Sequence, residues 1–252
     1  MEYHETPSEF IDIGNTAMKW RYTLNGGVVQ GGCRHGRDWA PVVELLLAGA
    51  PAQRLVSVWV ASVAGREADA EVTRLLLAAT GVQARFYYSR AEHHGVTNCY
   101  PEPVRLGVDR WVAMIEGFRR FGPCIIVDWG SALTIDAVDA HGHFMGGYIV
   151  PGLGMLRGAL LRDTADVHIE PGASSLGLGK STGQCVHNGL LRMSVAFVTE
   201  VVVELRQVLD DTCKVLVTGG DGPELLEAFA FDFEHMPDLV LDGLEFVAGE
   251  EQ

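Results

Sequence analysis

The sequence predicts an α/β protein built from two similar halves, each with a mixed β-sheet. One observation is a motif that occurs twice, in residues 10–16 (FIDIGNT) and again in residues 126–132 (IVDWGSA). In both copies an apolar run leads to Asp, one residue follows, and then come Gly and a small polar residue. The other observation is that each half contains strands followed by helical patterns, which is typical of layered α/β folds. Together they predict a duplicated domain.

The first half opens with short apolar runs that predict strands, and Gly26 and Gly27 predict a hairpin turn between two of them. Further along, the apolar residues change to helical spacing, return to a buried strand and become helical again up to Gly81. The expected elements are strands at 10–13, 17–24, 27–33 and 55–61, and helices at 39–48 and 66–80.

Residues 91–107 show little periodicity, so we expect a long loop, and long loops in compact domains are often functional. A helix should begin at Asp109 and end near Phe121, before the break at Gly122 and Pro123. The second half then repeats the pattern of the first. Its expected strands are 124–129, 133–138, 144–150 and 214–218, and its expected helices are 153–162, 182–208 and 223–230.

Length, composition and charge narrow the class of protein. The 252 residues suffice for two domains of about 120 residues each, and we expect them at 1–118 and 119–252. Hydrophobic residues make up 48% and charged residues 21%, as in ordinary globular proteins. A formal charge of −14 disfavours binding to DNA, RNA or an anionic membrane. We therefore expect neither nucleic acid nor membrane as a partner.

The cysteines and the N-terminus indicate a cytoplasmic protein. The five cysteines are odd in number and never have Cys-x-x-Cys spacing, so we expect neither a disulfide framework nor a zinc site. No apolar stretch approaches the length of about 18 residues that a membrane span needs. The first ten residues are acidic where a signal peptide would be basic and then apolar.

The two Asp-x-Gly turns have the composition of phosphate-binding turns. Gly lets the backbone approach closely, while N–H groups and hydroxyls donate to phosphate oxygens. An Asp at the end of a strand can orient a metal ion or its waters. Thr16 and Lys19 follow the first turn, and whether both reach one ligand depends on the twist of the hairpin. An ordinary Asx turn with a solvated Lys is the alternative for one copy, and the second copy favours a functional turn.

Asp109 and Arg110 lie side by side at a predicted helix start. The carboxylate could accept a proton from a substrate hydroxyl, while the guanidinium binds an acidic group. Asp is also an ordinary N-cap residue, and spacing alone favours that simpler role. Both interpretations stay open at the level of local pattern.

Two glycine-rich segments follow in the second half. Residues 177–183 (GLGKSTG) lack both the spacing and the preceding strand of a Walker phosphate loop, so we exclude that site. Thr182 within this segment could cap the next helix or contact a ligand. Residues 218–220 (TGG) follow a strand, and exposed glycine backbone there would let a flat group such as a nucleobase lie on it.

Six ordered blocks give the chain a family resemblance. They are DIGNTAMKW (12–20), GVDRW (107–111), VDWGSALTID (127–136), GGYIVPG (146–152), GKSTGQCVHNG (179–189) and TGGDG (218–222). In this order they resemble type III pantothenate kinase, of the acetate and sugar kinase/Hsp70/actin superfamily. The resemblance implies two duplicated ribonuclease-H-like (actin-like ATPase) domains with mixed sheets and a cleft between them, in which ATP is bound. It also implies a homodimer.

The resemblance further implies ATP-dependent phosphorylation of pantothenate to 4'-phosphopantothenate, the first step of coenzyme A biosynthesis. Magnesium and a monovalent cation, potassium or ammonium, would be required. Asp109 would be the proton acceptor, and Asp128 would bind the monovalent cation. The ATP phosphates would be held by Asp12, Ile13, Gly14, Asn15, Thr16, Ala17, Met18 and Lys19, and ATP would also meet Ser131. Pantothenate would meet Tyr100, Gly107, Val108, Asp109, Arg110 and Thr182.

The sequence departs from the family pattern at two positions of the second turn. Ser131 stands where the family usually has Thr, which keeps the hydroxyl, and Trp129 is bulky for its place between Asp128 and Gly130. Two alternative functions stay open. One is another small-molecule kinase of the same fold, and the other is a non-catalytic transcription accessory protein, although the charge of −14 opposes contact with DNA.

Overall fold

The computed structural model describes residues 8–24, 27–48, 55–163, 175–209, 213–220 and 226–250. Its contacts divide the chain into two compact units, each considered by itself below. The first comprises Met1–His93, Tyr100–Glu116 and Leu239–Gln252, and the second comprises His94–Cys99 and Gly117–Asp238. The domains expected at 1–118 and 119–252 stay a prediction, because a cluster of contacts does not demonstrate independent folding.

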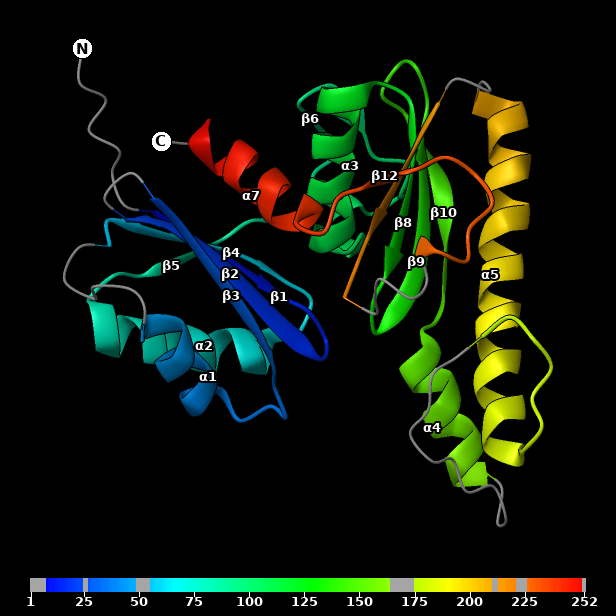
Figure 1. The fold of residues 1–252 in the computed structure, drawn as a ribbon. Helices are drawn as coiled ribbons and strands as arrows, with labels where there is room; N and C mark the ends of the chain where they lie inside the picture. Colours follow the sequence, from blue (N-terminus) through cyan, green and yellow to red (C-terminus); the bar gives the residue numbers. More distant parts are fainter. Residues whose placement is uncertain are drawn as a thin grey trace. The chain divides into compact units, whose positions relative to one another are not determined.

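The first unit contains a five-stranded mixed sheet of order β3-β2-β1-β4-β5 (Figure 1). Strands β1, β2 and β3 form an antiparallel meander, and β4 and β5 run parallel to β1. The bounds are β1 Ser8–Ile13, β2 Ala17–Leu24, β3 Gly27–Arg34, β4 Ser57–Ser62 and β5 Ala84–Phe86. The strands expected in this half are therefore confirmed, with β1 beginning two residues earlier than expected.

Alternation along the strands sends one set of side chains into the core of the first unit. Ile11, Met18 and Val60 are fully buried with the apolar faces of helices α1 (Trp39–Leu47) and α2 (Arg66–Thr80). These two helices lie together on one face of the sheet (Figure 1). Helix α2 ends where it was expected to end, because Gly81 adopts a left-handed φ of 73° and caps it.

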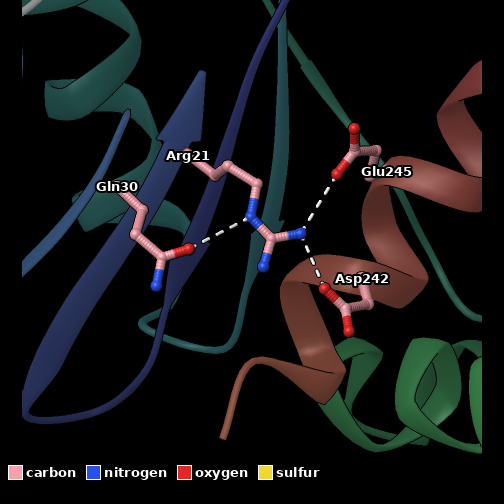
Figure 2. A network of polar contacts seen from close by, with 4 residues as sticks. All are labelled: Arg21, Gln30, Asp242 and Glu245. Atoms are coloured by element: carbon pink, nitrogen blue, oxygen red, sulfur yellow. Dashed lines mark hydrogen bonds and ion pairs between the residues drawn. The ribbon is translucent and has the colours of Figure 1, made fainter. Parts of the chain in front are cut away.

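Helix α7 (Leu239–Gly249) packs against β1, β2 and β4. Arg21 of β2 binds this helix to the sheet, because its Nη1 donates to Asp242 at 2.6 Å and to Glu245 at 3.1 Å (Figure 2). The Arg21 Nε also donates to Gln30 of β3 at 3.4 Å. Because Arg21 is offset by one residue from the core-facing Trp20, it points to the opposite face of the sheet from α1 and α2.

The second unit repeats the topology of the first, with sheet order β10-β9-β8-β11-β12. Again an antiparallel meander of three strands is followed by two strands parallel to its first one. The bounds are β8 Cys124–Trp129, β9 Ala132–Val138, β10 Phe144–Pro151, β11 Lys214–Thr218 and β12 Glu234–His235. Identical strand order and direction confirm the duplicated α/β fold that the doubled Asp-x-Gly turn predicts.

Helices α4 (Leu153–Asp163) and α5 (Thr182–Leu209) accompany this second sheet, both as expected. Within the described residues, α5 is the one helix long and apolar enough to cross a membrane by length and composition. A core helix passes the same test, and Leu191, Val198 and Val202 of α5 are buried against the sheet in the core of this unit. One face of α5 is therefore a core face of the second unit.

The chain segment that connects the two sheets is more structured than the expected loop at 91–107. It contains β6 (Glu92–His93), β7 (Val96–Thr97) and the 3₁₀ helix η1 (Pro103–Arg105) before helix α3 (Val108–Phe121). Strands of two residues are too short for any periodicity to show in the sequence. Of the helix expected at 223–230, residues 223–225 lie outside the described residues, and within 226–230 only Leu226 is helical, so the expected helix ends earlier than predicted. Helix α7 was not anticipated from the sequence.

Candidate active site

The first Asp-x-Gly turn joins β1 to β2 in the first unit. The Gly14 N–H donates to the Ala17 carbonyl at 2.9 Å and closes the turn. Asp12 at the end of β1 pairs directly across the sheet with Lys19 of β2. Neighbouring Ile13 and Met18 point into the core, so Asp12 and Lys19 share the opposite face of the hairpin. A carboxylate and an ammonium thus stand together beside the turn, as a phosphate and metal site requires.

Asp109, Arg110 and Tyr100 come together at the start of α3. The Asp109 Oδ1 accepts the Arg110 N–H at 2.8 Å, and the Arg110 Nη1 donates to the Tyr100 hydroxyl at 3.1 Å. Helix α3 begins at Val108, so Gly107 and not Asp109 occupies the cap position. Asp109 nevertheless stabilises the first turn through its bond to Arg110. Asp109 therefore stabilises the start of α3. This structural role does not prevent its carboxylate from also accepting a proton.

Burial acts on the acidity of Asp109. Desolvation raises the pKa of the Asp109 carboxyl above its ordinary value, and the N–H and charge of Arg110 oppose the rise. A carboxylate with a raised pKa is a better proton acceptor near neutral pH. Gly107 leaves room for this carboxylate, since a Cβ at residue 107 would lie 2.5 Å from the Asp109 Oδ1. Within residues 107–110, the Arg110 N–H and the space left by Gly107 together orient the Asp109 carboxylate.

Val63 links these two parts of the first unit. Its N–H donates to the Ile13 carbonyl at 3.0 Å, at the end of β1 just before the first Asp-x-Gly turn. Its Cγ1 lies 3.7 Å from where a Cβ on Gly107 would stand. The residue that follows β4 thus bonds to the end of β1 and lies near Gly107, at the start of the block that carries Asp109. The candidate phosphate site and the candidate base are neighbours within the first unit.

The second Asp-x-Gly turn joins β8 to β9 in the second unit. The Gly130 N–H donates to the Ala132 carbonyl at 3.0 Å, as Gly14 does in the first copy with Ala17. Asp128 pairs across the sheet with Thr134 of β9 and with Thr218 of β11. The Thr134 hydroxyl is buried and has no hydrogen-bond partner in the described part of the chain. Asp128 is therefore flanked by hydroxyl oxygens, which are suitable ligands for a hard cation.

Two glycines pack against the backbone of this second turn. A Cβ on Gly152 would lie 2.3 Å from the Gly130 carbonyl oxygen, and the Gly152 N–H donates to the Ser131 carbonyl at 3.0 Å. A Cβ on Gly219 would lie 2.3 Å from the Trp129 carbonyl oxygen. The bulky Trp129 side chain is buried in the core of its unit and contacts Phe229. Trp129, bulky for its place in the motif, is thus a core residue. Gly152 and Gly219 pack so closely on the turn that neither position has room for a side chain.

Thr182 lies at the first position of α5 and is exposed. Ser181 caps this helix, because its Oγ accepts the Gln184 N–H at 3.3 Å and the Gln184 Oε1 accepts the Lys180 N–H at 2.9 Å. The capping role left open for Thr182 is therefore filled by its neighbour. A ligand-binding role for Thr182 stays a prediction.

Two side chains near these motifs, His35 and Asn188, had no role predicted from the sequence, although Asn188 lies in the block 179–189. His35 contacts the first turn, and Asn188 of α5 holds the loop before α5 by accepting the Ser175 N–H at 3.0 Å and donating to the Gly177 carbonyl at 2.9 Å. A His after a strand has no local signature, whereas the block 179–189 could have directed attention to Asn188. Among the described residues, no group of three His, Cys, Asp or Glu side chains could hold a metal ion.

Solved structures with similar folds place the chain in a class. A putative 2-dehydro-3-deoxygalactonokinase from Sinorhizobium meliloti aligns over 96% of both chains with a TM-score of 0.53 and 14% identity. A putative Baf family transcriptional activator from Campylobacter jejuni aligns over 96% of this chain and 98% of its own, with a TM-score of 0.56 and 18% identity. These likenesses concern the fold, which is that of the sugar kinases and actin-like ATPases.

Sequence comparison identifies the family. The family model described as Type III pantothenate kinase matches residues 10–204. A Type III pantothenate kinase from Alcanivorax borkumensis is 68% identical over 246 residues, which cover 96% of this chain and 99% of the relative. The chain belongs to the type III pantothenate kinase family. It is therefore a kinase, and its phosphoryl donor is ATP.

Proposed function

We propose that this chain phosphorylates pantothenate with Asp109 as the proton acceptor. The reaction, transfer of the γ-phosphoryl group of ATP to the primary hydroxyl of pantothenate, is the first step of coenzyme A biosynthesis. The observation that supports the assignment of the base is the position of Val63, whose N–H donates to the Ile13 carbonyl and whose Cγ1 lies 3.7 Å from where a Cβ on Gly107 would stand. This position of Val63 supports a location of the Asp109 carboxyl, whose pKa is raised by burial, near the Asp12–Lys19 turn.

The chemistry requires one bond to form while another breaks. The hydroxyl oxygen of pantothenate bonds to the γ-phosphorus, the bond from that phosphorus to the bridging oxygen of ADP breaks, and the hydroxyl proton moves to the Asp109 carboxylate. Such transfers depend mainly on positioning and charge stabilisation. Residues 12–19 would hold the phosphates and Ser131 would contact ATP. Tyr100, Gly107, Val108, Arg110 and Thr182 would bind pantothenate.

Two cations belong to the proposal. Asp12 suits Mg²⁺, which commonly binds through one or two carboxylates together with substrate phosphates and would neutralise their charge. Asp128 suits a monovalent cation, potassium or ammonium, and the support is its position between Thr134 and Thr218 with the Thr134 hydroxyl unpaired in the described part of the chain. Asp128→Asn should weaken the dependence of activity on potassium, and an unchanged potassium response would remove Asp128 from this role.

A homodimer in the cytoplasm completes the proposal. Strand β10 lies at the edge of its sheet and exposes Met145, Tyr148 and Ile149, with Met155 of α4 also exposed. Exposed apolar side chains on an edge strand favour association with a second copy. Light scattering should give the mass of two chains for the native protein and of one for Ile149→Lys. A mass of one chain for the native protein would contradict the proposed homodimer.

We also retain 1–118 and 119–252 as the proposed domains.

The decisive test is a substrate panel combined with Asp109→Asn. Purified protein should consume ATP with pantothenate and not with sugars or other small alcohols. Asp109→Asn should lower kcat by about 10²-fold or more, the usual contribution of a positioned base, while ATP affinity changes little. Turnover near that of the native protein would refute the base assignment. Preference for another alcohol would favour another kinase of the same fold, and no ATP consumption at all would favour an accessory protein.

A further inference from the structure

We propose that His35 is a positioning residue for ATP, because it holds the phosphate turn in the conformation that presents its amides. This inference rests on the proposed function of residues 12–19. His35 follows β3 directly and is 8% exposed. No motif in the sequence marks it, and it belongs to none of the six blocks that carry the family resemblance.

His35 makes two hydrogen bonds to the turn. Its backbone N–H donates to the Thr16 carbonyl at 2.9 Å, and its imidazole Nε2 lies 3.0 Å from the Gly14 carbonyl oxygen. A carbonyl oxygen only accepts, so Nε2 carries the proton of this bond. The turn is thereby held at both of its ends by one residue, in addition to the bond from Gly14 to Ala17.

The bond to the Gly14 carbonyl determines where the next amide points. A trans peptide is planar, and its C=O and N–H point in opposite directions. The described residues contain no cis peptide bond. Fixing the Gly14 carbonyl towards His35 therefore directs the Asn15 N–H away from His35, and Asn15 itself is exposed. An amide fixed in this direction is a ready donor for a phosphate oxygen and needs no reorganisation on binding.

The surroundings of the imidazole hold it in place. Its ring lies 4.3 Å from the ring of Trp39, the first residue of α1, at an angle of 38°. Its Nδ1 is buried and has no hydrogen-bond partner in the part of the chain that the structure describes. Among the described residues, the His35 side chain therefore has one polar contact, to Gly14, and one ring contact, to Trp39. Packing and hydrogen bonding can be removed separately.

The test compares two substitutions of His35. His35→Phe keeps a ring against Trp39 and loses the donor, whereas His35→Gln loses the ring and keeps an N–H that can reach Gly14. Calorimetry with the non-hydrolysable analogue AMPPNP and with AMP measures the effect on the phosphates. For His35→Phe we expect about tenfold weaker AMPPNP binding, the scale of one lost hydrogen bond, and unchanged AMP binding. The KM for ATP should rise while the KM for pantothenate stays constant.

Rescue and controls separate positioning from packing. His35→Gln should bind AMPPNP within about threefold of the native affinity, a small part of one hydrogen bond. His143→Phe is the matched control, because its Nδ1 also makes one hydrogen bond, to Asp139 at 3.1 Å in an exposed turn. It should change neither ligand. Should His35→Phe lose its fold, His35→Gln and His35→Met give the same comparison with unbranched side chains.

Native AMPPNP affinity in His35→Phe would overturn the inference, as would equal losses for AMPPNP and AMP that His35→Gln does not restore. Asp12→Asn distinguishes this failure from a failure of the proposed function. If Asp12→Asn weakens AMPPNP binding and His35→Phe does not, the phosphate turn stands and the role of His35 is wrong. If neither substitution affects AMPPNP, the assignment of residues 12–19 to the ATP phosphates is wrong as well.

Discussion

The Arg21 guanidinium on β2 lies 2.6 Å from the Asp242 carboxylate on α7, so residues near the two ends of the chain are joined within one unit (Figure 2). The Arg21 side chain is 12% exposed and the Asp242 side chain 26%. A charge-assisted bond at such partial burial is stronger than an ordinary surface ion pair, although solvent still screens it. Glu245 adds a second, more exposed acceptor at 3.1 Å.

Breaking this pair should loosen α7. We expect Arg21→Met to lower the free energy of unfolding by about 1–3 kcal/mol, because two carboxylates lose their partner. Glu245→Gln should cost less than about 1 kcal/mol, the range of exposed pairs. Urea denaturation of Arg21→Met, Asp242→Asn and the double variant measures the coupling. Strict additivity of the two substitutions would show that Arg21 and Asp242 do not interact in solution.

Glu9 should make stability depend on pH. Its side chain is fully buried and neither carboxylate oxygen has a partner in the described part of the chain, and burial raises the pKa of Glu9 from 4.5 to about 8. Between these values the unfolded chain has lost the proton and the folded chain keeps it. Stability should therefore be highest near and below pH 4.5 as far as Glu9 is concerned, and fall as pH rises towards 8.

Glu9→Gln should remove that dependence. The variant should melt at a higher temperature than the native protein at pH 8 and at a similar temperature at pH 5. At pH 8 its free energy of unfolding should be higher by on the order of a few kcal/mol. Exposed Glu44 offers a matched control, since Glu44→Gln should leave the pH profile unchanged. If Glu9→Gln and the native protein show parallel melting curves across this range, Glu9 ionises normally in the folded state.

Gly219 should tolerate no side chain. Its φ is 103°, and an added Cβ would lie within 2.5 Å of the Trp129 backbone nitrogen, carbonyl carbon and oxygen. Gly219→Ala should therefore destabilise the protein by at least about 1–3 kcal/mol from backbone strain alone. Gly220 is the matched control, because nothing lies within 4 Å of its Cβ position. Equal melting temperatures for Gly219→Ala and Gly220→Ala would contradict this packing.

Gly107→Ala should affect activity more than folding. The added methyl would displace the Asp109 Oδ1, the end of a side chain, and not the backbone. We expect kcat to fall about tenfold or more, because a misplaced base loses much of its 10²–10⁴-fold effect, while the melting temperature changes by a few degrees at most. Gly154→Ala, which meets nothing within 4 Å, controls for the substitution itself. Native kcat in Gly107→Ala would separate Asp109 from the chemistry.

The local pattern of the chain determined most of the fold. Apolar runs ending at Asp12 and Asp128 predicted β1 and β8, and the helical spacing up to Gly81 predicted α2, all confirmed. Such elements depend on neighbouring residues, so a period of two or of 3.6 residues reveals them.

Helix α7 carries a local signal of the same kind, although it was not anticipated. Val240, Leu241, Leu244 and Val247 recur at helical spacing, and all four are buried. A stripe of this spacing is what one buried face of a helix requires. The pattern could therefore have predicted the helix, but nothing in it indicates that this helix packs against β1, β2 and β4.

Only the tertiary structure decided how distant residues meet. The sequence contains His35, Gly14, Arg21 and Asp242, but no periodicity relates the members of either pair. Their contacts depend on strand order and register, which place β3 beside β2 and α7 against the sheet. Likewise, only the fold brings Val63 to the Ile13 carbonyl and to within 3.7 Å of the Cβ position of Gly107, two residues before Asp109. Local pattern specifies elements because it acts between near neighbours, whereas a site is assembled by contacts between residues far apart in the chain.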